Sequence, residues 1–487
     1  MLLSSIRRDW SANPMREMLA GAVATFALIP EVIAFSFVAG VDPEVGLFAS
    51  FVISIAIAFT GGRPAMISAA AGSVALVAAP LVHAHGLPYL FAAGLLAGLM
   101  QIVFGLLRLG VLMRFVSKSV RTGFVNALAI LIFAAQMPHI IGAGWMEYAV
   151  LIAGLAIIYL TPRITTAIPS PLICILILTV ASIALGLPVL AVADLGKLPD
   201  SLPVFGWPAV PLTLETLRII AAPALAIAMV GLLESMMTAS VVDDLTDTPS
   251  SKNRECTGLG LANAAASLFG GIAGCGMIGQ TVSNVKYGGR GRLSTLFAGA
   301  FLLILMVLLK PWVSEVPVAA LVAIMVMVSI DTFDWSSLRA VVVHPRMSSA
   351  VMVATVLVTV FTANLALGVT VGVLLSGVFF TFKVASLLRV DVAPDQAGRL
   401  VYRVSGQVFF ASADVFVEAF EVQDAVGKSV LIDVSEAHFW DITAVAALDK
   451  VVQRFGAHGI AVEVAGLNQA SATLIGSLDG KVVLKEV

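Results

Sequence analysis

Two glutamates stand inside long apolar stretches of this chain. Glu31 has no other charged residue within ten positions on either side, and Glu234 has none within eight. An ionised carboxylate near the centre of a bilayer costs several kcal/mol, and its repulsion of a bound anion adds to that cost. Because uptake of a proton relieves both, we predict that Glu31 couples proton binding to anion binding. The alternative is a structural glutamate hydrogen-bonded to a neighbouring helix end.

Glu234 repeats this pattern 203 residues later in the chain. It is interpreted as a second protonatable site, as a sodium ligand or as an anchor between helices, and the anchoring role is favoured. Asp243, Asp244 and Asp247 follow it. We interpret these aspartates as the solvated end of the same helix.

The composition identifies the environment of these carboxylates. Of the 487 residues, 59% are hydrophobic and 12% are charged, and the mean hydropathy is +1.02. A soluble protein carries about 25% charged residues. The 44 residues between Arg63 and Arg108 include no charge, which is enough for two spans at about 20 residues each. The sequence therefore predicts a polytopic α-helical protein embedded in the lipid bilayer.

Glycine, proline and charged residues divide the apolar part into about fourteen segments. Their approximate centres are residues 28, 53, 76, 98, 130, 154, 180, 229, 263, 283, 302, 322, 358 and 376. Basic residues gather before the first segment and after the even-numbered ones. Because positively charged loops stay on the cytoplasmic side, we predict a multi-pass protein of the cell inner membrane with its N- and C-termini in the cytoplasm.

The third and tenth segments, residues 69–82 and 270–286, are short and rich in small residues. Small residues allow close helix packing in membranes. In transporters built from inverted repeats, however, such a pair forms half-helices whose N-termini point at an anion. The 203-residue offset also relates Gly72 to Cys275, which we expect at the heads of these two segments. The spacing favours two duplicated halves of seven segments each.

Three motifs resemble those of the sulfate permease family of anion transporters. They are ALIPEVIAFSFVAGVDPEVGLFASF, AGSVALV and MIGQTVSNVKYGGRGRLS, in the first, third and tenth segments. The resemblance implies fourteen transmembrane helices in two inverted repeats, about 17–190 and 215–388. It also implies a core domain of helices 1–4 and 8–11 and a gate domain of helices 5–7 and 12–14. Family members are often homodimers and carry sulfate, bicarbonate, chloride or dicarboxylates.

The resemblance places the substrate between the N-termini of the third and tenth helices. We expect two triplets of backbone amides to face the anion there, assisted by the polar side chains among them: Gly72, Ser73 and Val74, and Gly279, Gln280 and Thr281. Phe35, one helical turn from Glu31, is a further candidate for the lining, and plain packing is the alternative for this ring.

Two departures from the family pattern bear on the substrate. Many members have glutamine at the position of Glu31, whereas proton-coupled bacterial members often have the acid. Relatives frequently have an arginine where this chain reads Gly279-Gln280-Thr281, so a fixed positive charge is missing. We therefore expect a secondary transporter that carries a small anion with protons by alternating access, with a dicarboxylate such as fumarate slightly favoured over sulfate and bicarbonate.

Residues 391–487 form a separate domain by composition, because 20 of these 97 residues are charged against 38 of the 390 before them. Alternating strands and helices predict a small α/β domain with a partly parallel sheet. The stretch VLIDVSEAHFWDITAVAALDKV resembles the STAS domain shared by sulfate transporters and anti-sigma-factor antagonists. Thr443 stands at its phosphoacceptor position but lacks the flanking serine and glycine, so we expect a docking module without catalysis.

The remaining features narrow the classes of function. A net charge of −2 argues against a nucleic-acid partner, and the chain has no nucleotide-binding loop or nucleophile–base arrangement, so neither an enzyme nor a cofactor is expected. His83 and His85 lack further metal ligands, and Cys174, Cys256 and Cys275 lack disulfide or metal spacing. The alternatives to a symporter are an anion channel, an anion exchanger or a transporter-like anion sensor.

Overall fold

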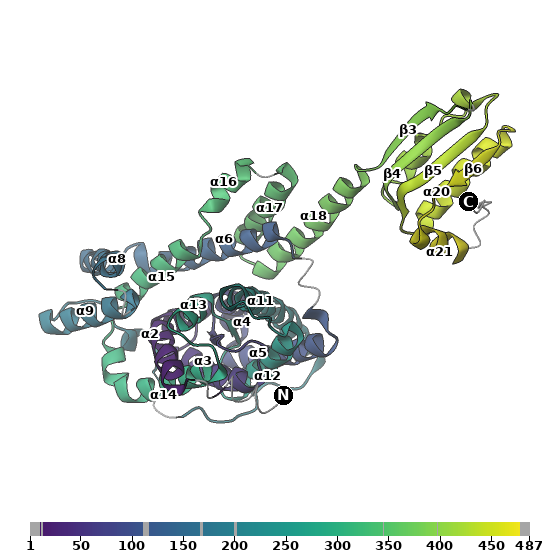
Figure 1. The fold of residues 1–487 in the computed structure, drawn as a ribbon. Helices are drawn as coiled ribbons and strands as arrows, with labels where there is room; N and C mark the ends of the chain where they lie inside the picture. The colour runs from purple at the N-terminus through teal and green to yellow at the C-terminus, as the bar shows by residue number, and fades with distance from the viewer. Residues whose placement is uncertain are drawn as a thin grey trace. The chain divides into compact units, whose positions relative to one another are not determined.

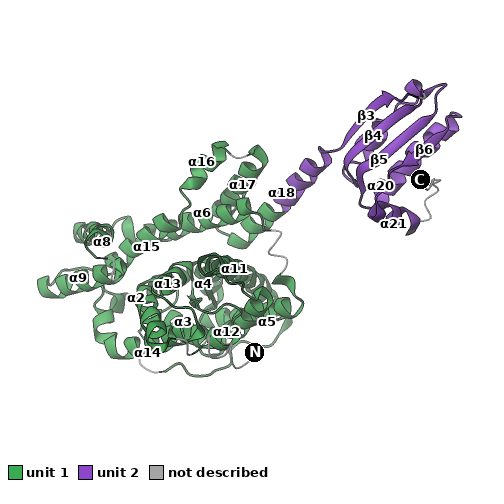
Figure 2. Cartoon of the chain, viewed as in Figure 1, with its two compact units in different colours: residues 1–373 green, residues 374–487 purple. Residues whose placement is uncertain are grey.

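The computed structural model describes residues 10, 13–110, 116–165, 169–198, 202–343, 345–396 and 398–477. The chain forms two compact units, residues 1–373 and 374–487 (Figure 2). The first unit is built of helices around a two-stranded sheet, and the second holds a four-stranded sheet. The division falls within one long helix, α18 (Leu365–Ala385).

Nine helices of the described part are long and apolar enough to cross a bilayer. Seven are α2 (Pro14–Ala39), α3 (Pro43–Thr60), α5 (Leu87–Leu106), α8 (Trp145–Ile164), α11 (Leu214–Thr246), α14 (Arg292–Ser314) and α18. The other two are the span Lys118–Ile140, which begins with α6 (Lys118–Ala135), and the span Val318–Val343, which begins with α15 (Val318–Thr332).

Five further helices complete the predicted set. They are α4 (Gly72–His85), α9 (Ser170–Leu185), α12 (Lys252–Leu268), α13 (Ile278–Lys286) and α17 (Arg346–Thr362). Each of the fourteen predicted centres lies within one of these fourteen helices, so the segment assignment is confirmed. Three short helices connect them: α7 (Met137–Ile140), α10 (Val192–Leu195) and α16 (Ser336–Val343).

The helices of the first unit sort into two groups (Figure 1). A core group contains α2 to α5 and α11 to α14, and a gate group contains α6, α8, α9 and α15 to α17. The two groups touch where α2 and α4 of the core meet α6, α9 and α15 of the gate. The expected division into core and gate is therefore observed for thirteen of the fourteen helices, and α18, the fourteenth, spans the boundary between the two units.

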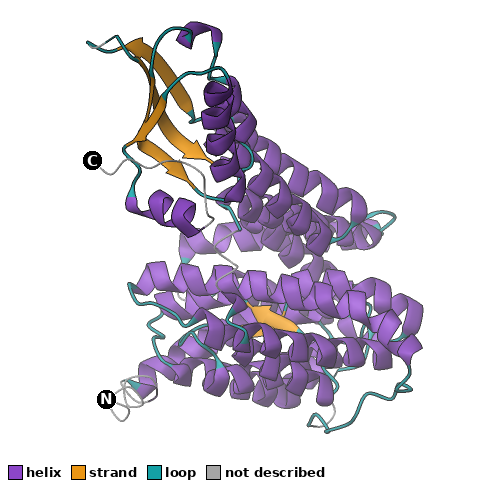
Figure 3. Cartoon of the chain, turned by 90° about the vertical axis from the view of Figure 1, so that its right-hand side faces the viewer, coloured by secondary structure: helices purple, strands orange, loops and turns teal. Residues whose placement is uncertain are grey.

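A two-stranded sheet lies among the helices of the core group (Figure 3). β1 (Ser68–Ala70) pairs antiparallel with β2 (Gly274–Gly276), and α4 and α13 begin just after these strands. The sequence assigned both stretches to helices, which was wrong. Cys275 lies in β2, where its extended backbone pairs with Ala69, and not at the head of a helix.

The pairing brings two backbones very close together. A Cβ atom on Gly274 would lie 2.0 Å from the carbonyl oxygen of Ala69, so only glycine fits there. The two helices that follow begin at Gly72 and Ile278, and their offset is therefore 278 − 72 = 206 residues, not the 203 that separates the glutamates.

Side chains of neighbouring helices satisfy the backbone of β2. The Oγ atom of Ser235 accepts from the Gly276 N–H at 2.9 Å, and the Oδ1 atom of Asn263 accepts from the Gly274 N–H at 2.8 Å. Thr238 donates its hydroxyl to the Gly276 carbonyl at 2.8 Å. Because lipid offers no partner to an exposed peptide group, these bonds make a short sheet tolerable inside a membrane.

The backbone of β1 is satisfied by two serines of α3. Ser54 donates its hydroxyl to the Ser68 carbonyl at 2.8 Å, and the Ser50 Oγ atom accepts from the Ala70 N–H at 3.2 Å. Both serines are fully buried. Backbone groups of both strands are thus hydrogen-bonded to side chains of neighbouring helices.

Charged residues near the first- and tenth-segment motifs hold helix ends together. The Glu17 carboxylate accepts from the backbone N–H groups of Arg290 and Gly291 at 2.7 and 2.9 Å, which caps the start of α14. The Arg292 guanidinium donates to the carbonyls at the end of α3, those of Ala58 and Gly61. The closing part of the tenth-segment motif is therefore structural.

Asp243 is also structural, and its interpretation as a solvated helix end was wrong. Its carboxylate lies 3.2 Å from the buried Arg63 guanidinium and 3.0 Å from the Lys252 ammonium. These ion pairs tie the end of α11 to the start of α12 and to the loop after α3.

The second unit contains a sheet of order β3-β4-β5-β6. β3 pairs antiparallel with β4, and the other two pairings are parallel, which confirms the predicted partly parallel sheet. Its elements are β3 (Arg389–Pro394), β4 (Leu400–Val408), α19 (Ala413–Glu418), η2 (Gln423–Ala425), β5 (Val430–Phe439), α20 (Ile442–Ala457), β6 (Val462–Ala465) and α21 (Gln469–Ser477). The sequence missed β3 because its side chains are mostly exposed and show no alternation. The sequence also predicts a final strand after the last helix of this domain, and that stretch lies outside the described residues.

Thr443 lies exposed in the first turn of α20. Asp441, two residues before it, caps this helix by accepting from the Ala444 N–H at 2.8 Å, and it also accepts from the Phe410 N–H at 2.8 Å. The aspartate therefore has a local structural role, and modification of Thr443 stays an untested prediction.

The variant Ser235→Ala tests the support of β2. It leaves the buried Gly276 N–H without its partner, and we expect it to lower the free energy of unfolding by ~1–3 kcal/mol, measured by thermal or denaturant unfolding in detergent. Ser314→Ala is the matched control, because that hydroxyl bonds only to a carbonyl of its own helix. Equal stability of the two variants would contradict the account.

Candidate functional site

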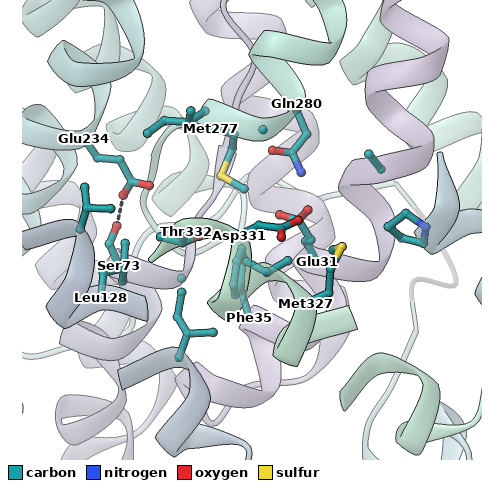
Figure 4. Close-up of a pocket in the computed structure, with 18 of the residues that line it drawn as sticks. Glu31, Phe35, Ser73, Leu128, Glu234, Met277, Gln280, Met327, Asp331 and Thr332 are labelled. Carbon is teal, nitrogen blue, oxygen red and sulfur yellow. Dashed lines mark hydrogen bonds between the residues drawn. The ribbon is translucent and has the colours of Figure 1, made fainter. Parts of the chain in front are cut away.

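A cavity of about 580 Å³ lies between the core and gate groups of the first unit. Residues of α2, α4, α11 and α13 form its core side, and residues of α6, α15 and the start of α9 form its gate side. Seven of the nine predicted site residues line it: Glu31, Phe35, Gly72, Ser73, Glu234, Gly279 and Gln280 (Figure 4).

The first residues of both half-helices border this cavity. α4 begins at Gly72 and α13 at Ile278, and both residues belong to the lining. The N-terminus of a helix presents unpaired N–H groups and the positive end of its dipole, and it is a ready site for an anion. Two such helix N-termini, those of α4 and α13, therefore border one cavity.

The two predicted glycines occupy different surroundings at these helix starts. A Cβ atom on Gly279 would meet nothing within 4 Å, so the helix start at this point is open. A Cβ atom on Gly72 would lie 2.6 Å from the ring of Phe35. Phe35 therefore both packs on the start of α4 and contributes to the lining.

Val74 and Thr281 do not line the cavity, although the sequence placed both in the site. Val74 is fully buried in the helix packing. The hydroxyl of Thr281 accepts from the Ile67 N–H at 3.0 Å, which turns this side chain toward β1 and away from the cavity.

Gln280 directs its side-chain amide, a hydrogen-bond donor, into the cavity. Its side chain is only 1% exposed, and its amide nitrogen has no hydrogen-bond partner of good geometry among the described residues. Figure 4 shows this nitrogen directed toward Glu31, which lines the same cavity. This amide can donate a hydrogen bond to an anion bound in the cavity.

Glu234 is held by two neighbours at the core side of the cavity. The hydroxyl of Ser73 donates a short hydrogen bond to its carboxylate (Figure 4), and the thiol of Cys275 donates at 3.1 Å. These bonds join α11 to the start of α4 and to β2. They agree with the anchoring role favoured from the sequence.

Asp331 is a lining residue that the sequence analysis missed. It belongs to α15, so it faces the cavity from the gate side together with Thr332 and Met327. In the sequence, Asp331 stands near the end of a helical segment, where an acid is usually exposed to solvent. Only the packing of α15 against the core group, which the sequence does not show, identifies Asp331 as a lining residue.

The charges around the cavity are all negative. Glu31, Glu234 and Asp331 line it, and no lysine, arginine or histidine is found among the described lining residues. Positive potential comes from helix N-termini, those of the half-helices α4 and α13 and that of α9, which begins at the lining residue Ser170. An anion in this cavity therefore lies close to acids that repel it while they are ionised.

His83 and His85 lie in the exposed last turn of α4, not in a loop. The ring of His85 contacts that of Tyr89 at 5.1 Å between centroids. In the described ranges, no group of three or more histidines, cysteines or acids could hold a metal ion.

Comparison with known proteins identifies the family. The model of the sulfate permease family matches residues 15–150 and 143–355, and the STAS domain model matches residues 391–479. The chain belongs to the sulfate permease family. It is 51% identical to YbaR of Bacillus subtilis, a candidate sulfate transporter, over 97% of this chain and 98% of that protein.

More distant relatives of this family member include transporters of other anions. The bicarbonate transporter BicA of Picosynechococcus is 27% identical over 91% of this chain and 86% of its own. The solved transmembrane domain of a cyanobacterial BicA is 25% identical, with a TM-score of 0.65, over 73% of this chain and 97% of its own. Murine Slc26a9, an anion transporter, shares the fold with a TM-score of 0.85 and 17% identity, over 98% of this chain and 90% of its own.

A double-mutant cycle tests the anchor between Ser73 and Glu234. We expect Ser73→Ala and Glu234→Leu each to lower the free energy of unfolding, with a coupling of about 0.5–3 kcal/mol between them, because they remove the same bond. Ser73→Ala combined with Glu17→Gln is the control and should be additive, since Glu17 caps a different helix. Additive effects in the first pair would contradict a direct bond.

Proposed function

We propose that this protein is a secondary transporter of the inner membrane that carries a small anion together with protons by alternating access. The observation that carries the proposal is the cavity in which two half-helix N-termini meet beside Glu31 without any cationic side chain among the described lining residues. The names of the relatives, which give sulfate and bicarbonate as substrates, support the class of anion.

The absence of a lysine or arginine from the described lining supports the coupling to protons. Two helix ends together supply roughly one positive charge, which does not outweigh an anion and the acids of the cavity. When Glu31 takes up a proton, its repulsion of the anion is removed and its hydroxyl becomes a donor. Anion and proton then bind with positive coupling, which is the thermodynamic requirement for symport.

The position of the cavity supports alternating access. Its walls divide between the core group, which holds Glu31 and both half-helices, and the gate group, which holds Asp331. Movement of one group against the other would open the same site to either side of the membrane. The distribution of basic residues favours an orientation with both termini in the cytoplasm.

The chemistry of the cavity suits a carboxylate substrate as well as sulfate or bicarbonate. A volume of about 580 Å³ lies within the range of small-molecule sites. The Gln280 amide and a protonated Glu31 both donate hydrogen bonds, and a dicarboxylate such as fumarate could accept both. Uptake of labelled anions into proteoliposomes under an imposed pH gradient would rank these substrates.

Glu31→Gln should abolish accumulation driven by a pH gradient, because glutamine cannot exchange a proton, while anion exchange continues. The measurement is uptake and counterflow of the preferred labelled anion in proteoliposomes. Glu215→Gln is the control, because Glu215 is exposed at the start of α11 and outside the cavity. Accumulation by Glu31→Gln at the level of the unmodified protein would refute the coupling role.

Gly279→Val tests where the anion lies. The new side chain enters open space at the start of α13, so we expect unchanged thermal stability and at least a tenfold rise in the KM for uptake. Gly377→Val is the control, since a Cβ atom there also meets nothing within 4 Å but the residue does not line the cavity. An unchanged KM in Gly279→Val would place the anion elsewhere.

A further inference from the structure

A second polar cavity of about 550 Å³ lies in the gate group, apart from the one between core and gate. It is formed by the starts of α6 and α17 and by one face of α16. Two cations, Lys118 and Arg339, line it together with a single carboxylate, Asp334. Six hydroxyl side chains complete its polar surface: Ser119, Thr122, Ser336, Ser337, Ser348 and Ser349.

Two helices of sufficient length present their positive ends to this cavity. α6 begins at Lys118 and α17 at Arg346, and residues from the first turn of each belong to the lining. Backbone N–H groups without intrahelical partners and the helix dipole both favour an anion at such a point. In this cavity, the free N–H groups and the helix dipoles are combined with the positive charges of Lys118 and Arg339.

Ser349 provides independent evidence that something binds in this cavity. Its side chain is only 8% exposed, and its Oγ atom has no hydrogen-bond partner in the described part of the chain. A buried hydroxyl without a partner costs about 1–3 kcal/mol. An oxygen-rich ligand in the cavity that it lines would satisfy it.

The single carboxylate does not neutralise the two cations. The Oδ1 atom of Asp334 accepts from the Ser336 N–H at 3.1 Å and from the Ser336 hydroxyl at 2.6 Å, so this acid caps α16. Neither Lys118 nor Arg339 is ion-paired with another described residue. The cavity therefore has a net positive charge, which excludes a cation as its preferred ligand.

We infer that this cavity binds a phosphate group. Lysine, arginine, hydroxyl groups and helix N-termini together are the usual partners of phosphate oxygens. In the proposed orientation the site faces the cytoplasmic surface of the membrane, where phosphate is available from anionic lipid headgroups and from soluble phosphate.

The site shares its supporting segments with the substrate cavity. On α6, Thr122 lines the phosphate site and Phe124 lines the substrate cavity, and at the end of α15 the corresponding pair is Asp334 and Asp331. A phosphate group bound here holds α6, α16 and α17 together, and it thereby restricts movement of the gate group. Occupancy is expected to change the transport rate as well as the stability.

The test uses the full-length protein in nanodiscs, in two arms. In one, phosphatidylcholine discs are titrated with inorganic phosphate; in the other, discs contain increasing phosphatidylglycerol without phosphate. The measurement is the thermal unfolding temperature, together with bound lipid by native mass spectrometry. We expect one phosphate source to raise the unfolding temperature and the variant Lys118→Gln/Arg339→Gln to weaken its apparent affinity about tenfold or more.

Three further variants separate this site from general effects. Ser349→Ala should weaken binding several-fold without loss of folding, because alanine fits the same space. Arg346→Gln is the matched control, since Arg346 is an exposed cation at the start of α17 outside the lining. Gly279→Val, in the substrate cavity, should leave phosphate binding unchanged.

The arm that responds identifies the source of the phosphate, lipid or solution. The inference is overturned if neither source changes the unfolding temperature, or if the double variant and Arg346→Gln respond alike. It is also overturned if Gly279→Val abolishes the effect, because the phosphate would then occupy the substrate cavity.

Discussion

The structure of the first unit depends on the pairing of β1 with β2 in the interior of the core group. A membrane offers no water to unpaired peptide groups, so extended backbone is stable there only where protein satisfies it. Serines of α3 and polar residues of α11 and α12 supply the missing partners. This arrangement fixes where α4 and α13 begin, and it thereby sets the two positive helix ends beside one cavity.

The electrostatics of the site follow from this backbone arrangement. Since the positive potential belongs to main-chain groups, it cannot be removed by protonation or by movement of a side chain. The acids around it, Glu31, Glu234 and Asp331, have separate roles. Glu234 is tied to Ser73 and Cys275, Asp331 belongs to the gate group, and Glu31 stands beside the amide of Gln280. Glu31 and Glu234 both line the cavity from the core group, which also holds α4 and α13, but only Glu234 is held by Ser73 and Cys275.

Much of the helical framework could be predicted from sequence because apolar length and charge punctuation are strong signals in a membrane protein. Glu31 and Glu234 were found as isolated charges, and the two half-helices were found as short segments of small residues. The strands were missed, because Ser-Ala-Ala and Gly-Cys-Gly have no β-branched or aromatic residue to indicate extended backbone. Thr281 was misplaced since its hydroxyl is needed by Ile67, a partner 214 positions away in the chain.

Asp331 and the phosphate site could not be predicted from the sequence, for a related reason. Both depend on how the ends of helices distant in the chain meet, and residues such as Lys118 and Arg339 look like ordinary loop charges. The positive-inside pattern explains why basic residues lie on that side. It does not indicate which of them converge on one cavity with an unpaired hydroxyl, as at Ser349.

The central claim is that binding of the anion and protonation of Glu31 are one linked event, and the affinity for the anion as a function of pH tests it most directly. The measurement is equilibrium binding of the preferred anion to the purified full-length protein, with and without Glu31→Gln. The account predicts that the Kd of the unmodified protein rises about tenfold per pH unit once Glu31 is ionised in the free state, and that the Kd of the variant does not depend on pH over that range. A Kd that varies with pH in the same way in both proteins would contradict it.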